Sequence, residues 1–340
     1  MKRHMIVLGV ALVFAITLRH GLDLRAASQR ELTATVRQVV GVEIEQAHAV
    51  RISNNGRDWV YVLRDSVWRY PNYHDAYVQQ PRIDQFLRAV LTSSGSIIFD
   101  KLSTQRFGFG SDHAIDFSVM DHRGRSIAAA TVGRGIPGRE DNESYLRKAG
   151  EDTVYHLHAN PHLALDAAAV PMIDRHLLPH ALSRGTVVRI EFEDREGLVD
   201  SIWRQDIPPD PDDPRPFRGP MYRWQVQLAG KDTTCIDSNV YAYLSYLNRL
   251  RYGRLLSSEE SEDSVGIGRV ILKDDRGTID TLQVVDGGNE AIVHNHRARQ
   301  VSTLSKELAA LVFPTASILL DTLPQSNMYD RAAPRMNGGL

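Results

Sequence analysis

Apolar and polar residues alternate along much of the chain. The clearest alternating runs come in two pairs, and a short polar tetrapeptide joins the members of each pair. Period-two alternation is typical of strands with one buried face, and a polar turn between two such runs indicates a hairpin. We therefore predict two antiparallel hairpins. Their runs and turns are 114–120 and 126–132 around Asp121-His-Arg-Gly124, and 269–272 and 278–285 around Asp274-Asp-Arg-Gly277.

Helical spacing of apolar residues interrupts this pattern upstream of each predicted hairpin. In the segment 81–91, Ile83, Phe86, Leu87, Val90 and Leu91 follow the spacing of one helix face, and the segment 240–250 has a similar pattern. A second helical segment is predicted late in each half. In the first half Asn160-Pro161 would begin it, and in the second it would span 302–312.

The two halves therefore contain the same elements in the same order. Three local matches support this: Val50-Arg-Ile-Ser with Val188-Arg-Ile-Glu, the two hairpin turns, and Val154-Tyr-His-Leu-His158 with Ile292-Val-His-Asn-His296. We predict an α+β protein of two tandem duplicated domains, each an antiparallel sheet with flanking helices. The domains would span 47–183 and 184–323, after a stem at 28–46 and before a flexible tail at 324–340.

An uncharged apolar run, residues 5–18, lies between Lys2-Arg3-His4 and Arg19. Its fourteen residues would span about 21 Å as a helix, less than the hydrocarbon core of about 30 Å. Residues 1–27 are then an uncleaved single-pass anchor, which we favour, a cleaved signal peptide with a poor cleavage site, or a buried soluble helix. As an anchor, this transmembrane helix would leave the rest of the chain extracytoplasmic, in the periplasm.

Composition narrows the function classes. The 340 residues carry 40 basic and 42 acidic side chains, a net charge of −2, which does not favour nucleic acid as a partner. The single cysteine, Cys235, excludes an intramolecular disulfide and a cysteine-based zinc site.

The two halves differ in two insertions. The first contains a Gly- and Arg-rich segment, 133–150, and the second a proline-rich segment that ends at Pro220. Six of the fifteen prolines lie in that segment, so it should be extended, either as a stiff surface loop or as a loop that binds a partner. Its candidate partner-binding residues are Pro208, Pro209, Pro211, Pro214, Pro216 and Phe217.

No motif predicts a catalytic residue or a cofactor site. The sequence Gly133-Arg-Gly-Ile-Pro-Gly138 has the spacing of a dinucleotide fingerprint, but no amphipathic helix follows it, so we interpret it as a hairpin loop. Five histidines fall between positions 156 and 180. The weak candidate metal ligands among them are His156, His158 and His176.

A series of short motifs resembles a known family. In order these are the Val50 strand start, Trp68-Arg-Tyr-Pro71, the helix at 81–91, Arg106-Phe-Gly-Phe109, the Asp121 hairpin, Gly133, Tyr145-Leu-Arg147 and Val154-Tyr155. The chain resembles the family catalogued as domain of unknown function 4340 over about 47–183, and more loosely in the second half, which lacks the Phe-Gly turn and the Tyr-Leu-Arg strand. The resemblance implies a bacterial, single-pass, extracytoplasmic β-rich protein. Relatives are often encoded beside ABC transporter components similar to gliding-motility auxiliary proteins, and the family offers no catalytic residues.

We therefore expect a non-catalytic, membrane-anchored scaffold or assembly component in the cytoplasmic membrane. Its partners would be the membrane itself, through residues 5–18, and a membrane protein such as an ABC transporter subunit. Two alternatives stay open. One is a secreted metal-binding protein or hydrolase centred on the histidine cluster, and the other is a small-ligand binding module between the two repeats.

Overall fold

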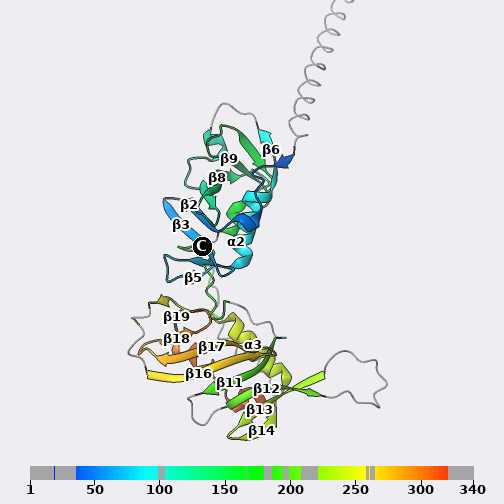
Figure 1. Cartoon of the computed structure of the whole chain (residues 1–340), viewed down its shortest axis with the longest axis vertical. Helices are drawn as coiled ribbons and strands as arrows, with labels where there is room; N and C mark the ends of the chain where they lie inside the picture. The colour runs from blue at the N-terminus through cyan, green and yellow to red at the C-terminus, as the bar shows by residue number, and fades with distance from the viewer. Residues whose placement is uncertain are drawn as a thin grey trace, which may run out of the picture. The chain divides into compact units, whose positions relative to one another are not determined.

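The structure, a computed structural model, divides the chain into two compact units (Figure 1). The first unit is formed by Met1–Pro71 and Val78–Ile173, and the second by Asn72–Tyr77 and Asp174–Leu340. The residues that the structure describes are 36–98, 104–165, 167–179, 186–193, 199–207, 221–257 and 265–320, together with Arg19 and Glu260.

The first sheet has ten strands, and the pairings among the first nine in sheet order are antiparallel. In sheet order the strands are β1 (Arg37–Gln38), β6 (Ser94–Ile98), β10 (Val154–Leu157), β9 (Ser144–Lys148), β8 (Ser126–Gly135), β7 (Ile115–Met120), β2 (Ala49–Asn54), β3 (Arg57–Arg64), β4 (Val67–Tyr70) and β5 (Ala76–Tyr77).

Helix α2 (Gln80–Leu87) lies beside the strands of this sheet (Figure 1). Pro81 stands in its first turn, where a missing N–H costs nothing, and Ile83, Phe86 and Leu87 form its buried face. The Phe86 ring meets Phe117 of β7 edge to face at 5.9 Å. The predicted helix at 81–91 is thus confirmed in position, but its last turn is a π-helix, η2 (Arg88–Thr92).

Three 3₁₀ turns also lie in the described part of the first unit: η1 (Ile44–Gln46), η3 (Thr104–Phe107) and η4 (Pro161–Ala164). Asn160 caps η4 by accepting a hydrogen bond from the His162 N–H at 3.1 Å. The predicted cap is therefore correct, whereas the helix expected to follow it is only this single 3₁₀ turn.

The second sheet has nine antiparallel strands, and the described residues of its unit form three α-helices. The helices are α3 (Asp237–Arg249), α4 (Lys306–Ala310) and α5 (Ala316–Leu320). In sheet order the strands are β14 (Lys231–Thr234), β13 (Met221–Leu228), β12 (Val199–Ile207), β11 (Val187–Glu193), β16 (Val265–Asp274), β17 (Gly277–Asp286), β18 (Ala291–Asn295), β19 (Gln300–Leu304) and β15 (Leu255–Leu256).

The two sheets have the same topology. When nine is added to the number of each strand from β2 to β10, the order β6-β10-β9-β8-β7-β2-β3-β4-β5 becomes the order of the second sheet read from its β15 end. The helix also recurs in the same place, with α2 between β5 and β6 and α3 between β14 and β15. Strand β1 is an addition to the first sheet.

This correspondence corrects two sequence matches. The predicted pairing of 154–158 with 292–296 is wrong, because the counterpart of β10 is β19 and not β18. Strand β18 is instead the counterpart of β9, so the second unit does possess the equivalent of the Tyr145-Leu-Arg147 strand. The helix predicted at 302–312 is also misplaced. Residues 300–304 are strand β19, and α4 begins only after Ser305, whose side chain accepts a hydrogen bond from the Leu308 N–H.

Both predicted hairpins are confirmed. Strands β7 and β8 pair around Asp121–Gly124, and β16 and β17 pair around Asp274–Gly277. The protein is therefore β-rich α+β, with two antiparallel sheets and few helices.

No helix within the described part of the chain is long and apolar enough to cross a membrane. The predicted anchor, residues 5–18, lies outside the described residues, as do residues 28–35 of the predicted stem and the whole predicted tail.

Candidate functional site

Several of the short sequence motifs meet in one aromatic cluster on the first sheet. Phe107 and Phe109, from the Arg-Phe-Gly-Phe turn, are buried with Val154 of β10, and Tyr145 and Ile98 pack against them. The Phe107 and Tyr145 rings are 4.9 Å apart, and the guanidinium of Arg147 lies 5.1 Å from the Phe109 ring centre. We call Phe107, Phe109, Val154, Ile98 and Tyr145 the Phe107 cluster. It lies on the sheet face opposite to that of Leu146, because alternate residues of a strand point to opposite faces.

Gly133 is required by this packing. A Cβ atom at Gly133 would lie 2.1 Å from the carbonyl oxygen of Phe107, a distance that no side chain tolerates. Gly133 and Gly135 both lie in β8, and the next element is the antiparallel strand β9. The helix N-terminus that holds a pyrophosphate in a dinucleotide fold is therefore missing after this glycine sequence, and its first glycine serves a close backbone approach.

The loop between β8 and β9, residues 136–143, is held by its own hydrogen bonds. The Ile136 N–H bonds the Glu143 carbonyl at 3.0 Å, and the Glu143 N–H bonds the Arg139 carbonyl at 2.9 Å. Backbone N–H groups of Glu140 itself and of Gly138 lower the pKa of the Glu140 carboxyl. The anion-binding N–H groups of this loop are therefore occupied by its own glutamate.

The structure places His156 and His158 beside each other. Their rings meet edge to face with centres 5.1 Å apart. His156 Nε2 lies 2.8 Å from the Glu143 carboxylate, which Arg139 also approaches at 3.2 Å. Burial alone would raise the pKa of Glu143, but the hydrogen bonds from His156 and Arg139 outweigh it and hold the pKa below its usual value. Glu143 is thus committed to these two partners.

The other histidines of the sequence cluster have separate partners. His162 Nε2 lies 2.7 Å from the Gly133 carbonyl, and burial lowers the pKa of this histidine. His176 belongs to the second unit, where its Nδ1 lies 2.6 Å from Asp174. His180 is outside the described residues. Within the described part of the chain, no group of three or more His, Cys, Asp or Glu side chains is arranged to hold a metal ion.

His158 opens onto a polar pocket of about 510 Å³ in the first unit. Its lining includes the end of α2, the π-helix η2 and part of the 136–143 loop. The lining residues are Gln85, Arg88, Ala89, Thr92, Ser93, Ser94, Asp141, Asn142, His158, Ala159, Asn160 and Leu163. This volume lies within the range of about 300 to 1,000 Å³ that is usual for ligand sites.

Side-chain hydroxyls stabilise the π-helix in the pocket wall. Both Thr92 Oγ1 and Ser93 Oγ donate to the Arg88 carbonyl, at 3.0 and 3.2 Å. Single π-helical turns are rare and frequently occur at functional sites. Hydrogen bonds also hold other lining residues, since the buried Ser144 hydroxyl donates to the Ala159 carbonyl at 2.7 Å and the His158 N–H bonds the Ser94 carbonyl at 2.9 Å.

The comparisons with known proteins give one match. The sequence model of the family described as "Domain of unknown function (DUF4340)" matches residues 68–266, which is more than half of the chain. The chain belongs to this family. No curated protein and no solved structure matches it. The DUF4340 match runs from the first unit into the second and includes the Phe107 cluster and the pocket residues from Gln85 to Leu163.

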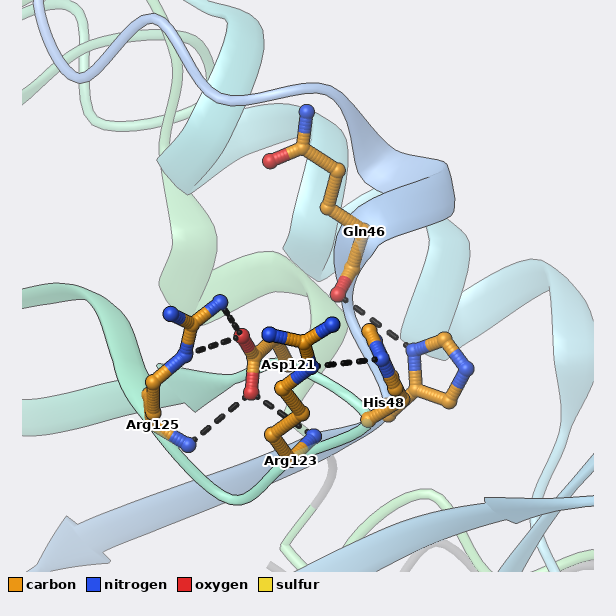
Figure 2. A network of polar contacts seen from close by, with 6 residues as sticks. Gln46, His48, Asp121, Arg123 and Arg125 are labelled. Atoms are coloured by element: carbon orange, nitrogen blue, oxygen red, sulfur yellow. Dashed lines mark hydrogen bonds and ion pairs between the residues drawn. The ribbon is translucent and has the colours of Figure 1, made fainter.

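The Asp121 hairpin of this DUF4340 chain is a structural turn (Figure 2). The Asp121 carboxylate accepts backbone N–H bonds from Arg125 and Arg123, at 2.9 and 2.8 Å, and two side-chain bonds from Arg125, at 2.8 and 2.7 Å. The backbone bond from Arg125 contributes most to lowering the pKa of Asp121, which is about 2. Its counterpart Asp274 accepts one such bond, from the Arg276 N–H at 2.8 Å.

Two further sequence candidates lie in the second unit. The Cys235 thiol is buried, and burial raises its pKa to about 12, so the nucleophilic thiolate is disfavoured there. The proline-rich segment, 208–220, lies outside the described residues, so its six candidate partner-binding residues have no described position. It connects β12 to β13, whose ends pair at Ile207 and Met221. The segment therefore connects the two strands of the second hairpin of this unit, β12 and β13, and not those of the first, β11 and β12.

The pocket is the feature that sequence reasoning missed. The sequence marks His158 only as a weak candidate metal ligand, and no motif marks Arg88 or Asp141. The apolar spacing at 81–91 fits an ordinary α-helix, so it gives no sign of a π-helical turn.

Proposed function

We propose that this DUF4340 protein is a non-catalytic scaffold or assembly component outside the cytoplasm, held at the cytoplasmic membrane by residues 5–18 and auxiliary to an ABC-type transport system. Three things support the proposal: the apolar run between basic residues, the membership of the family, and a fold built of sheets with no recognised catalytic motif in the sequence. The ABC-type partner is expected from the resemblance described above.

The two units are, in this proposal, copies of one duplicated repeat. The nine-strand order shared by the two sheets supports it, because a shared order of this length needs a separate explanation if the units arose independently. A duplication also gives one chain two similar surfaces, of which each can diverge toward a different partner.

One observation carries the binding role, namely the edge strand β14. All four of its residues, Lys231 to Thr234, are exposed, and in the sheet order it has a neighbour, β13, on one side only. An exposed edge offers unpaired backbone groups to an extended segment of another protein, which can add to the sheet as a further strand. Its neighbour β13 begins directly after the proline-rich segment. The two proposed partner-binding features, strand β14 and this segment, are therefore both adjacent to β13.

The test is site-specific photo-crosslinking in the native host, with a photoreactive residue at Thr233 of β14 and, as a control, at Asp275 in the β16–β17 turn. We expect Thr233 to give an adduct with a membrane protein and Asp275 to give none. Deletion of residues 1–27 should release the protein from the membrane fraction and abolish the adduct. Equal labelling from both positions would overturn the role of β14. If detergent-solubilised protein recovers no membrane partner but stoichiometric zinc, the metal-binding alternative replaces the scaffold.

A further inference from the structure

We infer that the pocket beside η2 binds the C-terminal carboxylate of a peptide, with Arg88 and His158 as the anion-binding groups. Such a site is independent of the membrane anchor and of strand β14.

Arg88 is the cation available for an anionic group. Elsewhere in the first unit Arg51, Arg125 and Arg139 each form an ion pair with a nearby carboxylate. Within the described residues, no carboxylate forms an ion pair with Arg88, although its side chain lines the pocket. An arginine fork matches the two oxygens of a carboxylate, which makes it the usual residue for this recognition.

His158 is available for the same reason. Glu143, the nearby acid that could have neutralised the histidine pair, is held by His156 and Arg139. Among the described residues, the His158 side chain has a contact of 3.5 Å between its Nδ1 and the Ser94 hydroxyl and an edge contact with the His156 ring, and no other polar contact. The other ring nitrogen, Nε2, has no hydrogen-bond partner among the described residues, and it donates to a ligand in the pocket in the tautomer whose Nδ1 accepts from the Ser94 hydroxyl.

The rest of the lining fits a peptide better than an inorganic anion. Asn142 and Gln85 offer amide groups that can both donate and accept, which suits peptide bonds, and Asp141 can accept from a peptide N–H. The loop's own backbone N–H groups at 138–140 are already taken by the Glu140 carboxylate, so they do not form an anion nest.

An apolar residue at the end of the peptide is the natural occupant of the remaining space. Leu163 lines the pocket and is 47% exposed, one of only three large hydrophobic residues that are exposed in the described part of the chain. Together with Ala89 it gives the pocket an apolar patch among its polar groups. A ligand with a free carboxylate and a small aliphatic side chain would cover Leu163.

Isothermal titration calorimetry on the full-length chain tests this with a matched pair of probes, N-acetyl-Ala-Ala-Leu and the same peptide with a C-terminal amide. We expect the acid to bind at least tenfold more tightly than the amide, because only the acid can form charge-assisted hydrogen bonds with Arg88 and His158. Arg88→Gln should remove this difference, and His158→Gln should reduce it. Arg57→Gln, which changes an exposed arginine outside the pocket lining, should preserve it.

Leu163→Ser should weaken the acid and the amide by the same factor, because it changes the apolar contact and not the carboxylate contact. Equal affinity for acid and amide, or no binding of either at millimolar concentration, overturns the proposal. Succinate serves as a third titrant. If it binds as tightly as the peptide acid, the site recognises small carboxylates and the assignment to a peptide end is wrong.

Discussion

The two units share one strand order, yet their corresponding strands are covered differently. In the first unit, β6, β10 and β9 carry Ile98, Val154 and Tyr145, and two phenylalanines from the Arg-Phe-Gly-Phe turn pack over them. In the second unit, the counterparts β15, β19 and β18 carry Leu256, Val301 and Ile292, which form an aliphatic cluster with Val285. The backbone topology therefore tolerates two different solutions for the same hydrophobic face.

The difference also explains where the motifs of the first half lie. The Phe107 cluster contains Phe107, Phe109 and Tyr145, and Gly133 allows the backbone to approach Phe107 closely. These four residues are therefore needed in the first unit alone. The pocket is next to this cluster, since the 136–143 loop continues from the β8 end that contains Gly133. The second unit can keep the fold without these residues, which is why it resembles the first in topology far more than in sequence.

The largest effect on stability is expected from disrupting the Phe107 cluster. Phe107→Ala removes a buried ring and should lower the free energy of unfolding of the first unit by about 3 kcal/mol. Hydrogen exchange followed by mass spectrometry would locate the loss of protection in β6, β9 and β10. Ile292→Ala is the matched change in the second unit and should reduce protection there only. A loss spread equally over both units after either substitution would show that they do not unfold separately.

Gly133→Ala comes next, because the new methyl group must displace the Phe107 backbone. We expect a loss of about 2 kcal/mol in the first unit. Gly266→Ala in β16 is the control, since nothing lies within 4 Å of a Cβ atom at that strand position. Thermal unfolding of the two variants in parallel checks the comparison, which fails if both shift the midpoint equally.

Sequence alone predicts the parts of this fold that depend on neighbours in the chain. The two Asp-x-x-Gly hairpins and the position of α2 follow from local pattern and were confirmed. The sequence predicts a helix at strand β19 because the buried residues of this strand include Gln300, Ser302 and Thr303, so the usual contrast between apolar and polar positions is lost. Polar residues that are buried in a sheet cannot be recognised from their sequence.

For a related reason, the sequence alone predicts neither which strands of the two units correspond nor where the pocket lies. The shared His-x-His sequence, at 156–158 and 294–296, suggests that β10 and β18 correspond, whereas only the strand order shows that β10 corresponds to β19. The pocket combines α2, η2, the start of β6, the 136–143 loop and the residues after β10, which are far apart in sequence. In the sequence Arg88 has the pattern of an ordinary exposed helix residue, and only the structure shows that it lines the same pocket as His158.

A smaller effect is expected at the two hairpin turns. Asp121→Asn should destabilise the first unit more than Asp274→Asn destabilises the second, because Asp121 also binds the Arg125 guanidinium. The folded pKa of about 2 lies below the usual value of 3.8, so the ionised carboxylate stabilises the fold above 3.8. This contribution is lost as the pH falls through about 2. Urea unfolding at several pH values should therefore show the Asp121→Asn deficit shrinking below pH 3.8, and a deficit independent of pH would argue against the charge as its cause.

The smallest effect should come from Asp280 in the second unit, and it should have the opposite sign. Asp280 is buried, and burial raises its pKa even though it accepts a hydrogen bond from the Thr281 N–H at 2.7 Å and lies near Arg297. A raised folded pKa means that the native state binds the proton more tightly, so the wild type loses stability as the pH rises from 3.8 through that pKa. Asp280→Asn keeps an acceptor oxygen without the buried charge. The variant should match the wild type at low pH and be slightly more stable at neutral pH, as urea unfolding would measure. If the advantage is largest at low pH, the carboxyl is not destabilised by burial, and the contrast with Asp121 disappears.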